Sequence, residues 1–158
     1  MASTICTSSD ATTIREATHF DINAIVAMGG RFLSSTTYRG RIKDNPTQRA
    51  ALVMHLIDSD NSVIFVADKG DDELVGFLGL FTYRHPMSDQ LFAAEIAWWV
   101  EPEARGKTGL QLLSAGETWA KNQKAEVLQM IAPIQELEQL YLRRGYIPIE
   151  RHFQKAMG

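Results

Sequence analysis

The chain has 158 residues, of which 45% are hydrophobic, 22% charged and 9% aromatic, and its formal net charge is −3. These values are typical of one globular domain spanning residues 1–158, and they exclude the disordered, collagen-like and coiled-coil classes. Because the charge balance is slightly acidic, we expect neither nucleic acid nor an anionic membrane as a partner.

The N-terminal residues and the single cysteine bear on the compartment. Residues 1–13 lack the basic start and the apolar run of a signal peptide, and the chain contains no apolar stretch of about 18 residues. Cys6 has no partner for an internal disulfide and lies in a polar segment outside any metal-ligand spacing. We therefore expect a cytoplasmic protein without a metal, in which residues 1–12 are frayed.

The first half of the chain alternates between strand and helix patterns. Asp21 is a candidate cap for a helix with apolar residues at helical spacing, and Pro46 suits the first turn of a second helix. Turn residues then separate two apolar runs with strand character. The expected elements are a strand at 13–16, helices at 22–33 and 46–57, and strands at 63–67 and 74–83.

The second half begins with an almost continuously apolar run over residues 91–100, in which Glu95 is the single charge. Such a run predicts a strand buried on both faces, in a central position. The elements expected after it are a helix from 108, a strand at 127–131, a helix ending at 143–145, and a last strand or hairpin at 147–156. The element order predicts an α+β fold with a mixed sheet and helices packed on it.

The segment from Glu95 to Gly109 is the most informative one chemically. A buried strand ends at Val100, a proline turns the chain, and a short Arg-Gly-Lys loop enters a helix. Free backbone N–H groups and the helix dipole favour an anion at such a helix start. Thr108 and Gln111 also match a capping box, which predicts that the helix begins after Thr108.

One candidate for that anion is a nucleotide triphosphate, because Gly106-Lys107-Thr108 imitates the end of a P-loop. The first glycine of a P-loop would fall on Glu101, which puts a negative charge beside phosphates. Pro102 also removes an N–H group from the loop. The element order does not suit a parallel nucleotide-binding sheet, so this hypothesis is disfavoured.

A second interpretation comes from two motifs in sequence. Residues Val100-Glu-Pro-Glu-Ala-Arg-Gly-Lys107 and Leu140-Tyr-Leu-Arg-Arg-Gly-Tyr146 resemble two motifs of the GNAT superfamily of N-acetyltransferases. These are Val-x-Pro-Glu-x-Arg-Gly-x-Gly-x-Gly/Ala and an apolar residue followed by Tyr-x-x-x-Gly-Phe/Tyr. The resemblance implies a mostly antiparallel, splayed mixed sheet of six to seven strands flanked by about four helices.

The resemblance implies acetyl-CoA as co-substrate and an N-acetyltransferase that joins the acetyl group to a primary amine in a ternary complex. The amine acceptor is a small molecule or a peptide, and a homodimer is an open possibility. The residues that would bind acetyl-CoA are Trp98, Trp99, Val100, Arg105, Gly106, Lys107, Thr108, Gly109 and Leu110.

Two departures from the first motif leave two alternatives open. Thr108 stands where relatives have glycine, and Leu110 stands where they have glycine or alanine. Glycine lets the backbone approach a pyrophosphate closely. Either Gly109 takes over that role, or the CoA loop is degenerate and the fold serves as a non-catalytic binding module.

Tyr141 and Glu95 are the candidate catalytic residues. Tyr141 matches the general acid of the family, which protonates the departing thiolate, although its apolar neighbours also suit a core tyrosine. Glu95 is a candidate general base, and the alternative is a carboxylate at a solvent-facing start of the strand. Trp98 and Trp99 are adjacent in a strand and are therefore expected on opposite faces of the sheet.

Overall fold

The computed structural model describes residues 11–158, and the secondary structure begins at Thr13. Cys6 and nearly all of the segment expected to be frayed lie outside the described residues. The elements expected up to residue 145 are present, in the predicted order. The fold is α+β with a mixed sheet, as the sequence predicts.

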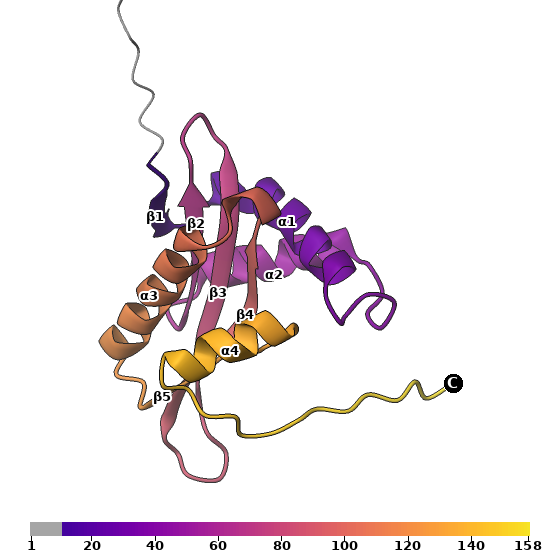
Figure 1. The fold of residues 1–158 in the computed structure, drawn as a ribbon, viewed down its shortest axis with the longest axis vertical. Helices are drawn as coiled ribbons and strands as arrows, with labels where there is room; N and C mark the ends of the chain where they lie inside the picture. The colour runs from indigo at the N-terminus through magenta and orange to yellow at the C-terminus, as the bar shows by residue number, and fades with distance from the viewer. Residues whose placement is uncertain (1–10) are drawn as a thin grey trace, which may run out of the picture.

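Five strands form one sheet in the order β1-β2-β3-β4-β5. Neighbouring strands from β1 to β4 are antiparallel, whereas β5 runs parallel to β4 (Figure 1). This largely antiparallel arrangement contradicts the P-loop hypothesis. The strands are β1 (Thr13–Glu16), β2 (Ser62–Asp68), β3 (Leu74–Arg84), β4 (Leu91–Val100) and β5 (Val127–Gln129).

Helices cover both faces of the sheet, which gives three layers. In Figure 1, α3 and α4 lie in front of the sheet, and α1 and α2 lie behind it. The helices are α1 (Ile22–Ser35), α2 (Pro46–Asp58), α3 (Lys107–Asn122) and α4 (Gln135–Arg143), with short 3-10 turns η1 (His19–Asp21) and η2 (Pro102–Ala104).

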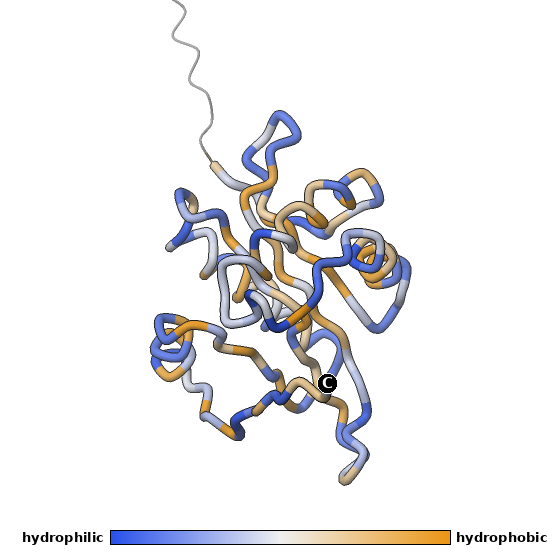
Figure 2. Tube along the Cα trace, turned by 90° about the vertical axis from the view of Figure 1, so that its right-hand side faces the viewer, coloured by the Kyte–Doolittle hydropathy of each residue, from blue (hydrophilic) through white to orange (hydrophobic). Residues whose placement is uncertain are grey.

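Each helical layer packs on the sheet through its own apolar core. The α3 and α4 core contains Trp98, Leu112 and Tyr141, whereas the α1 and α2 core contains Ile25 and Trp99. The expectation that the two tryptophans face opposite sides is therefore confirmed. The turn between β2 and β3 is hydrophilic, as its blue colour in Figure 2 shows, whereas the turn between β3 and β4 also exposes Met87.

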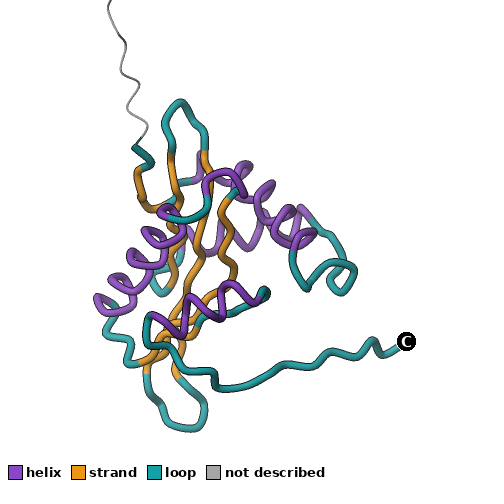
Figure 3. The backbone as a smooth tube through the Cα atoms, viewed as in Figure 1, coloured by secondary structure: helices purple, strands orange, loops and turns teal. Residues whose placement is uncertain are grey.

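The C-terminal segment differs from its prediction. Residues 147–156 were expected to form a strand or hairpin, but they run as an extended loop after α4 (Figure 3). Ile147 and Phe153 are 74% and 93% exposed, so the segment buries little of the apolar surface that suggested a strand. Pro148 also removes one ladder donor. The sheet of the described residues thus has five strands rather than six to seven.

Strand β4 is paired on both sides only at its beginning. It pairs with β3 along its whole length, but β5 reaches only Phe92, Ala93 and Ala94. Within residues 11–158 no strand pairs with the β5-facing edge of β4 from Glu95 to Val100. The sheet is therefore splayed at this point, and the central position predicted for β4 holds only for its first residues.

Gly116 of α3 packs tightly against strand β3. A Cβ atom there would lie 2.8 Å from Cδ2 of Leu78 and 2.9 Å from Cδ1 of Leu80, both fully buried. We expect Gly116→Ala to lower the free energy of unfolding by about 1–3 kcal/mol, because the core has no room for a methyl group. Chemical denaturation measures this.

Gly30→Ala in α1 is the matched control. Its Cβ would meet only the end of the Arg49 side chain, at 3.1 Å from Nη2, and alanine is the better helix former. Equal losses of stability in the two variants would contradict the tight packing of α3 on β3.

Candidate functional site

The start of α3 differs from its prediction in a way that favours a ligand. The helix begins at Lys107, and its N-cap is Gly106, so the proposed capping box from Thr108 to Gln111 is wrong. Gly106 has φ 100° and ψ −111°, a conformation that residues with a side chain rarely adopt. Because glycine has no side chain, this N-cap residue cannot accept a hydrogen bond from the first amides of the helix.

The first N–H groups of α3 lack protein acceptors. The first hydrogen bond of the helix runs from the Leu110 N–H to the Gly106 carbonyl, at 3.2 Å. The amides of Lys107, Thr108 and Gly109 come before it and have no helical partner. No other hydrogen bond within residues 11–158 uses them. The side chains of Lys107 and Arg105 beside them are exposed, so this helix start has the free donors and the positive charge that suit an anion.

The two departures from the family motif do not cover these amides. The Thr108 side chain is buried, with 8% of the residue exposed, so it points into the protein. Leu110 lies one position past the free amides and is 40% exposed. A Cβ atom at Gly109 would meet Trp98 and Val100 only at ordinary contact distances of 3.5 and 3.8 Å. The glycine that the backbone conformation requires is thus Gly106.

Arg105 connects this helix start to the end of β4. Its Nε donates a hydrogen bond to the Val100 carbonyl at 3.1 Å, and its guanidinium carbon lies 5.0 Å from the centre of the Trp99 ring. These contacts fix the stem of the side chain, and no hydrogen bond of the described residues uses its terminal Nη atoms. The guanidinium remains free to contact an anion at the amides.

A β-bulge interrupts β4 beside its unpaired edge. In the register with β3, Gly79 pairs with Ala97 and Leu80 pairs with Glu95, so Ile96 has no partner. The extra residue reverses the alternation of faces. Glu95 therefore lies opposite Leu80, on the sheet face that carries Trp98 and α4, whereas strict alternation would put it on the α1 face.

Glu95 is a buried carboxyl group at the point where β4 and β5 separate. It is 6% exposed, so the hypothesis of a solvent-facing carboxylate is wrong. Its Oε2 accepts a hydrogen bond from the Ile131 N–H at 2.8 Å. Burial raises the pKa of Glu95 to about 7, although the hydrogen bonds from Ile131 and Tyr141 act in the opposite direction.

Tyr141 of α4 meets Glu95 in the same network. Its hydroxyl donates to the Ile131 carbonyl at 3.0 Å and lies 3.5 Å from Oε2 of Glu95. The residue is 6% exposed, and its ring centre is 6.1 Å from that of Trp98. Burial, together with the Glu95 charge, raises the pKa of the Tyr141 hydroxyl far above its ordinary value. The two candidate catalytic residues are therefore in contact.

Two indole N–H groups in this region have no acceptor. The Nε1 atoms of Trp98 and Trp99 are buried and make no hydrogen bond within the described part of the chain. The Cζ2 atom of Trp98, two bonds from Nε1, lies 3.5 Å from where a Gly109 side chain would begin. A buried donor without a partner is uncommon in proteins.

Sequence reasoning missed two parts of this arrangement. The backbone of Ile131 both donates to Glu95 and accepts from Tyr141, and a backbone role leaves no mark on residue type. The bulge at Ile96 was also missed. Gly79, an isolated glycine in the facing strand, was the available signal, since such a glycine often marks a bulge.

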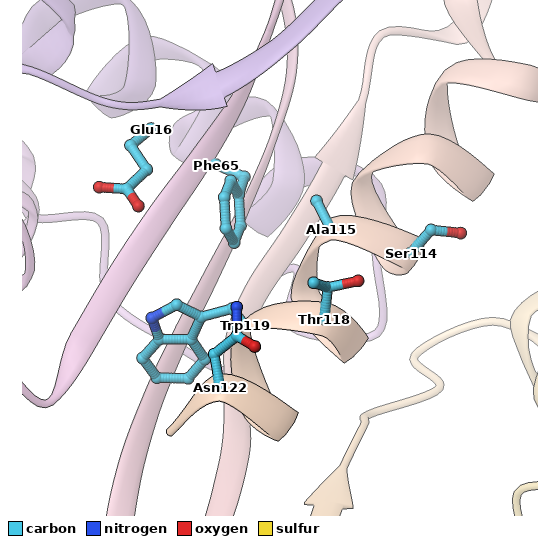
Figure 4. A pocket seen from close by; sticks show the side chains of 7 residues that line it. All are labelled: Glu16, Phe65, Ser114, Ala115, Thr118, Trp119 and Asn122. Atoms are coloured by element: carbon cyan, nitrogen blue, oxygen red, sulfur yellow. The ribbon is translucent and has the colours of Figure 1, made fainter. Parts of the chain in front are cut away.

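A separate hollow of about 430 Å³ lies on the far side of α3, between that helix and strands β1 and β2 (Figure 4). Glu16 is its single acidic side chain, and none of the predicted site residues lines it. The hollow is lined by Glu16, Phe65, Ser114, Ala115, Thr118, Trp119 and Asn122.

Two further observations concern metals and membranes. Among residues 11–158, no three His, Cys, Asp or Glu side chains lie close enough together to hold a metal ion. None of the helices in the same range has the length and apolar content of a membrane-spanning helix.

The fold and the helix start define a class of protein that agrees with the sequence comparison. The model of the Acetyltransferase (GNAT) family matches residues 32–146, well over half of the chain. The chain therefore belongs to the GNAT family of acetyltransferases. No curated protein matches the sequence.

Solved structures agree with the fold. A putative acetyl transferase from Pyrococcus furiosus superposes with a TM-score of 0.75 at 22% identity, covering 93% of this chain and all (100%) of that one. A transcriptional regulator from Bacillus halodurans C-125 gives 0.74 at 22% identity, with coverages of 93% and 100%. A predicted acetyltransferase with acetyl-CoA from Clostridium acetobutylicum gives 0.76 at 14% identity, with coverages of 93% and 97%.

Proposed function

We propose that this protein is an N-acetyltransferase that transfers the acetyl group of acetyl-CoA to a primary amine by direct attack within a ternary complex. The observation that carries the proposal is the uncapped helix start at Gly106, which lies next to the unpaired edge of β4. The helix start suits a diphosphate, and the unpaired edge of β4 suits an extended arm that pairs with the strand backbone.

The proposed acetyl-CoA site runs along β4 from the helix start toward Glu95. The free amides of Lys107, Thr108 and Gly109, together with the Arg105 and Lys107 charges, would hold the pyrophosphate, whereas the Leu110 amide is used within the helix. The edge from Trp98 to Val100 would pair with the pantetheine arm. Val100 and Glu95 are five residues apart, about 17 Å along a strand, so an elongated substrate can join the two ends of the site.

The proposed chemistry uses Glu95 and Tyr141 as base and acid. Glu95 would take a proton from the acceptor ammonium, directly or through water, and the neutral amine would then attack the thioester carbonyl. Tyr141 would give its hydroxyl proton to the departing thiolate. The ammonium proton taken by Glu95 would leave to solvent, and Glu95 would then accept the second proton, which the attacking nitrogen loses as the tetrahedral intermediate collapses to the amide. Because the two side chains lie 3.5 Å apart, this second proton can pass to the Tyr141 oxygen and restore both groups.

The bulge in β4 supplies a further element of the proposed mechanism. A bulge frees backbone groups from the ladder, and this one lies beside the unpaired edge. An N–H group there would stabilise the negative charge that develops on the thioester oxygen, an effect of about 3–4 kcal/mol in other enzymes.

Acetyl-CoA binding tests the proposal. At about 100 times its dissociation constant, a ligand stabilises the folded protein by about 2.7 kcal/mol. For a chain of this size, that corresponds to a rise in Tm of roughly 5–10 °C. We expect acetyl-CoA to produce such a rise in a thermal-shift titration. A flat response up to millimolar acetyl-CoA would favour the non-catalytic binding module instead.

Two glycine variants make this titration specific. Gly106 and Gly145 both have positive φ, 100° and 86°, and a Cβ atom would enter open space at either position. We expect Gly106→Ala and Gly145→Ala to lower Tm to a similar degree through backbone strain. Gly106→Ala alone should lose the response to acetyl-CoA, because the strain alters the amides. If acetyl-CoA raised the Tm of the two variants equally, the phosphate position proposed at Gly106 would be contradicted.

A further inference from the structure

A second hollow, of about 230 Å³, adjoins the bulge on the sheet face that carries α2. Its apolar wall consists of Leu52 and Leu56 from α2, Phe81 from β3 and Ile96 from β4. Ile96 is the bulge residue itself, and its neighbour Glu95 points to the opposite face. The hollow thus reaches the strand at the proposed reaction centre, from the side opposite α3 and α4.

The polar groups of this hollow are largely occupied by the protein. The Ser62 hydroxyl donates to the Leu56 carbonyl at 2.9 Å, and the Asn61 amide donates to the Thr82 carbonyl at 3.4 Å. His55 accompanies them in the lining, and none of the described residues that line the hollow is acidic. The surface offered to a ligand is therefore mainly apolar and lacks a carboxylate for additional cationic groups.

Aromatic rings continue the apolar wall beyond Phe81. The Phe81 and Tyr83 rings are stacked with centres 5.6 Å apart, and Phe92 follows at 5.8 Å from Tyr83. All three rings are partly exposed. Aromatic groups gain free energy from offset or tilted contacts with such rings, in addition to that from buried area.

We propose that this hollow binds the acceptor, and that the acceptor is a small primary amine with one apolar, preferably aromatic, group. This inference rests on the proposed acetyl transfer. The ring would lie against Phe81 and Leu52, and the amine would lie at the gap past Ala94. The volume is below the roughly 300–1,000 Å³ of typical drug-sized pockets, which suits a ligand with a single ring.

The test compares three amines at saturating acetyl-CoA, with release of the CoA thiol as the readout. We expect kcat/KM for 2-phenylethylamine to exceed that for ethylamine and for spermidine by at least about tenfold, since only this amine can bury an aromatic ring in the hollow. A higher kcat/KM for spermidine would overturn the inference while leaving acetyl transfer intact.

Two variants test whether the preference for 2-phenylethylamine depends on the hollow. Leu52→Asp introduces a charge into the hollow and should lower kcat/KM for 2-phenylethylamine about tenfold, with little change for ethylamine. Met87→Asp makes the same change in charge at a residue that is 90% exposed and does not line the hollow, and it should change neither value. Equal behaviour of the two variants would overturn the assignment of the hollow.

The remaining outcomes separate this inference from the proposed function. If no amine releases thiol and acetyl-CoA leaves Tm unchanged, the transferase proposal fails, and the inference fails with it. If acetyl-CoA raises Tm but 2-phenylethylamine releases no thiol, only the acceptor assignment is overturned.

Discussion

Replacing Glu95 by glutamine is expected to lower kcat about 100-fold to 10,000-fold, the usual range for loss of a general base. Glutamine retains an oxygen that can accept the Ile131 hydrogen bond, so the fold should persist. Steady-state rates with saturating acetyl-CoA measure the effect. An unchanged kcat at every pH would remove Glu95 from the mechanism.

The pH dependence gives a second measure of Glu95. Because only the ionised carboxylate accepts a proton, wild-type activity should rise as pH increases through about 7, and Glu95→Gln should lose this rise.

Stability should change with pH in the opposite direction. The pKa of Glu95 in the folded protein, about 7, lies above the ordinary value of 4.5, so folding favours the protonated form. Its contribution to stability is complete below about pH 4.5 and is lost as pH rises through about 7. Glutamine does not titrate. Urea titrations across this range should therefore show wild type losing stability relative to Glu95→Gln.

Tyr141→Phe is expected to lower kcat by at least about tenfold while leaving acetyl-CoA affinity nearly unchanged, because the hydroxyl would act only on the departing thiolate. This lower bound lies below the usual range of about 100-fold to 10,000-fold for general acid catalysis, since a thiol with a pKa of about 8–9 leaves fairly well unaided. Presteady-state and steady-state rates, together with acetyl-CoA titrations, separate the two effects.

Tyr146→Phe is the control for that variant. Tyr146 is packed against Tyr141 with ring centres 5.3 Å apart, but its hydroxyl bonds to Glu117 at 2.9 Å rather than to Glu95. Loss of this hydroxyl should leave kcat close to that of wild type. Equal losses in the two variants would indicate that packing of α4, and not proton donation, determines the rate.

The order of the elements could be predicted because each one has a local pattern. Apolar spacing marks the helices, the run from Leu91 to Val100 marks β4, and Arg143 to Gly145 marks the end of α4. The predictions that were wrong concern segments where the local sequence pattern and the tertiary context disagree. Residues 147–156 have strand-like apolar residues but no neighbouring strand, and Thr108 matches a capping box although the helix already begins at Lys107.

The candidate site could be predicted in part for a similar reason. The loop from Arg105 to Leu110 is continuous in sequence, so these residues could be predicted together as a candidate anion site, and their role stays a prediction. The contact between Glu95 and Tyr141 joins residues 46 positions apart, and it depends on an unpaired Ile96 that changes which face Glu95 occupies. Strict alternation along β4 predicts the wrong face, because the period of two holds only where no residue is inserted.

The placement of Trp98 and Trp99 in separate cores has a consequence for ligand affinity. Each ring is more than nine-tenths buried, one under α3 and α4 and the other under α1. Rotation of the strand about its own axis would empty both cores at once, so the backbone between the rings is held in one orientation before any substrate arrives. An arm that paired with this edge, as we propose for pantetheine, would therefore cost little ordering entropy on the protein side, and more of its contact energy would be retained as affinity.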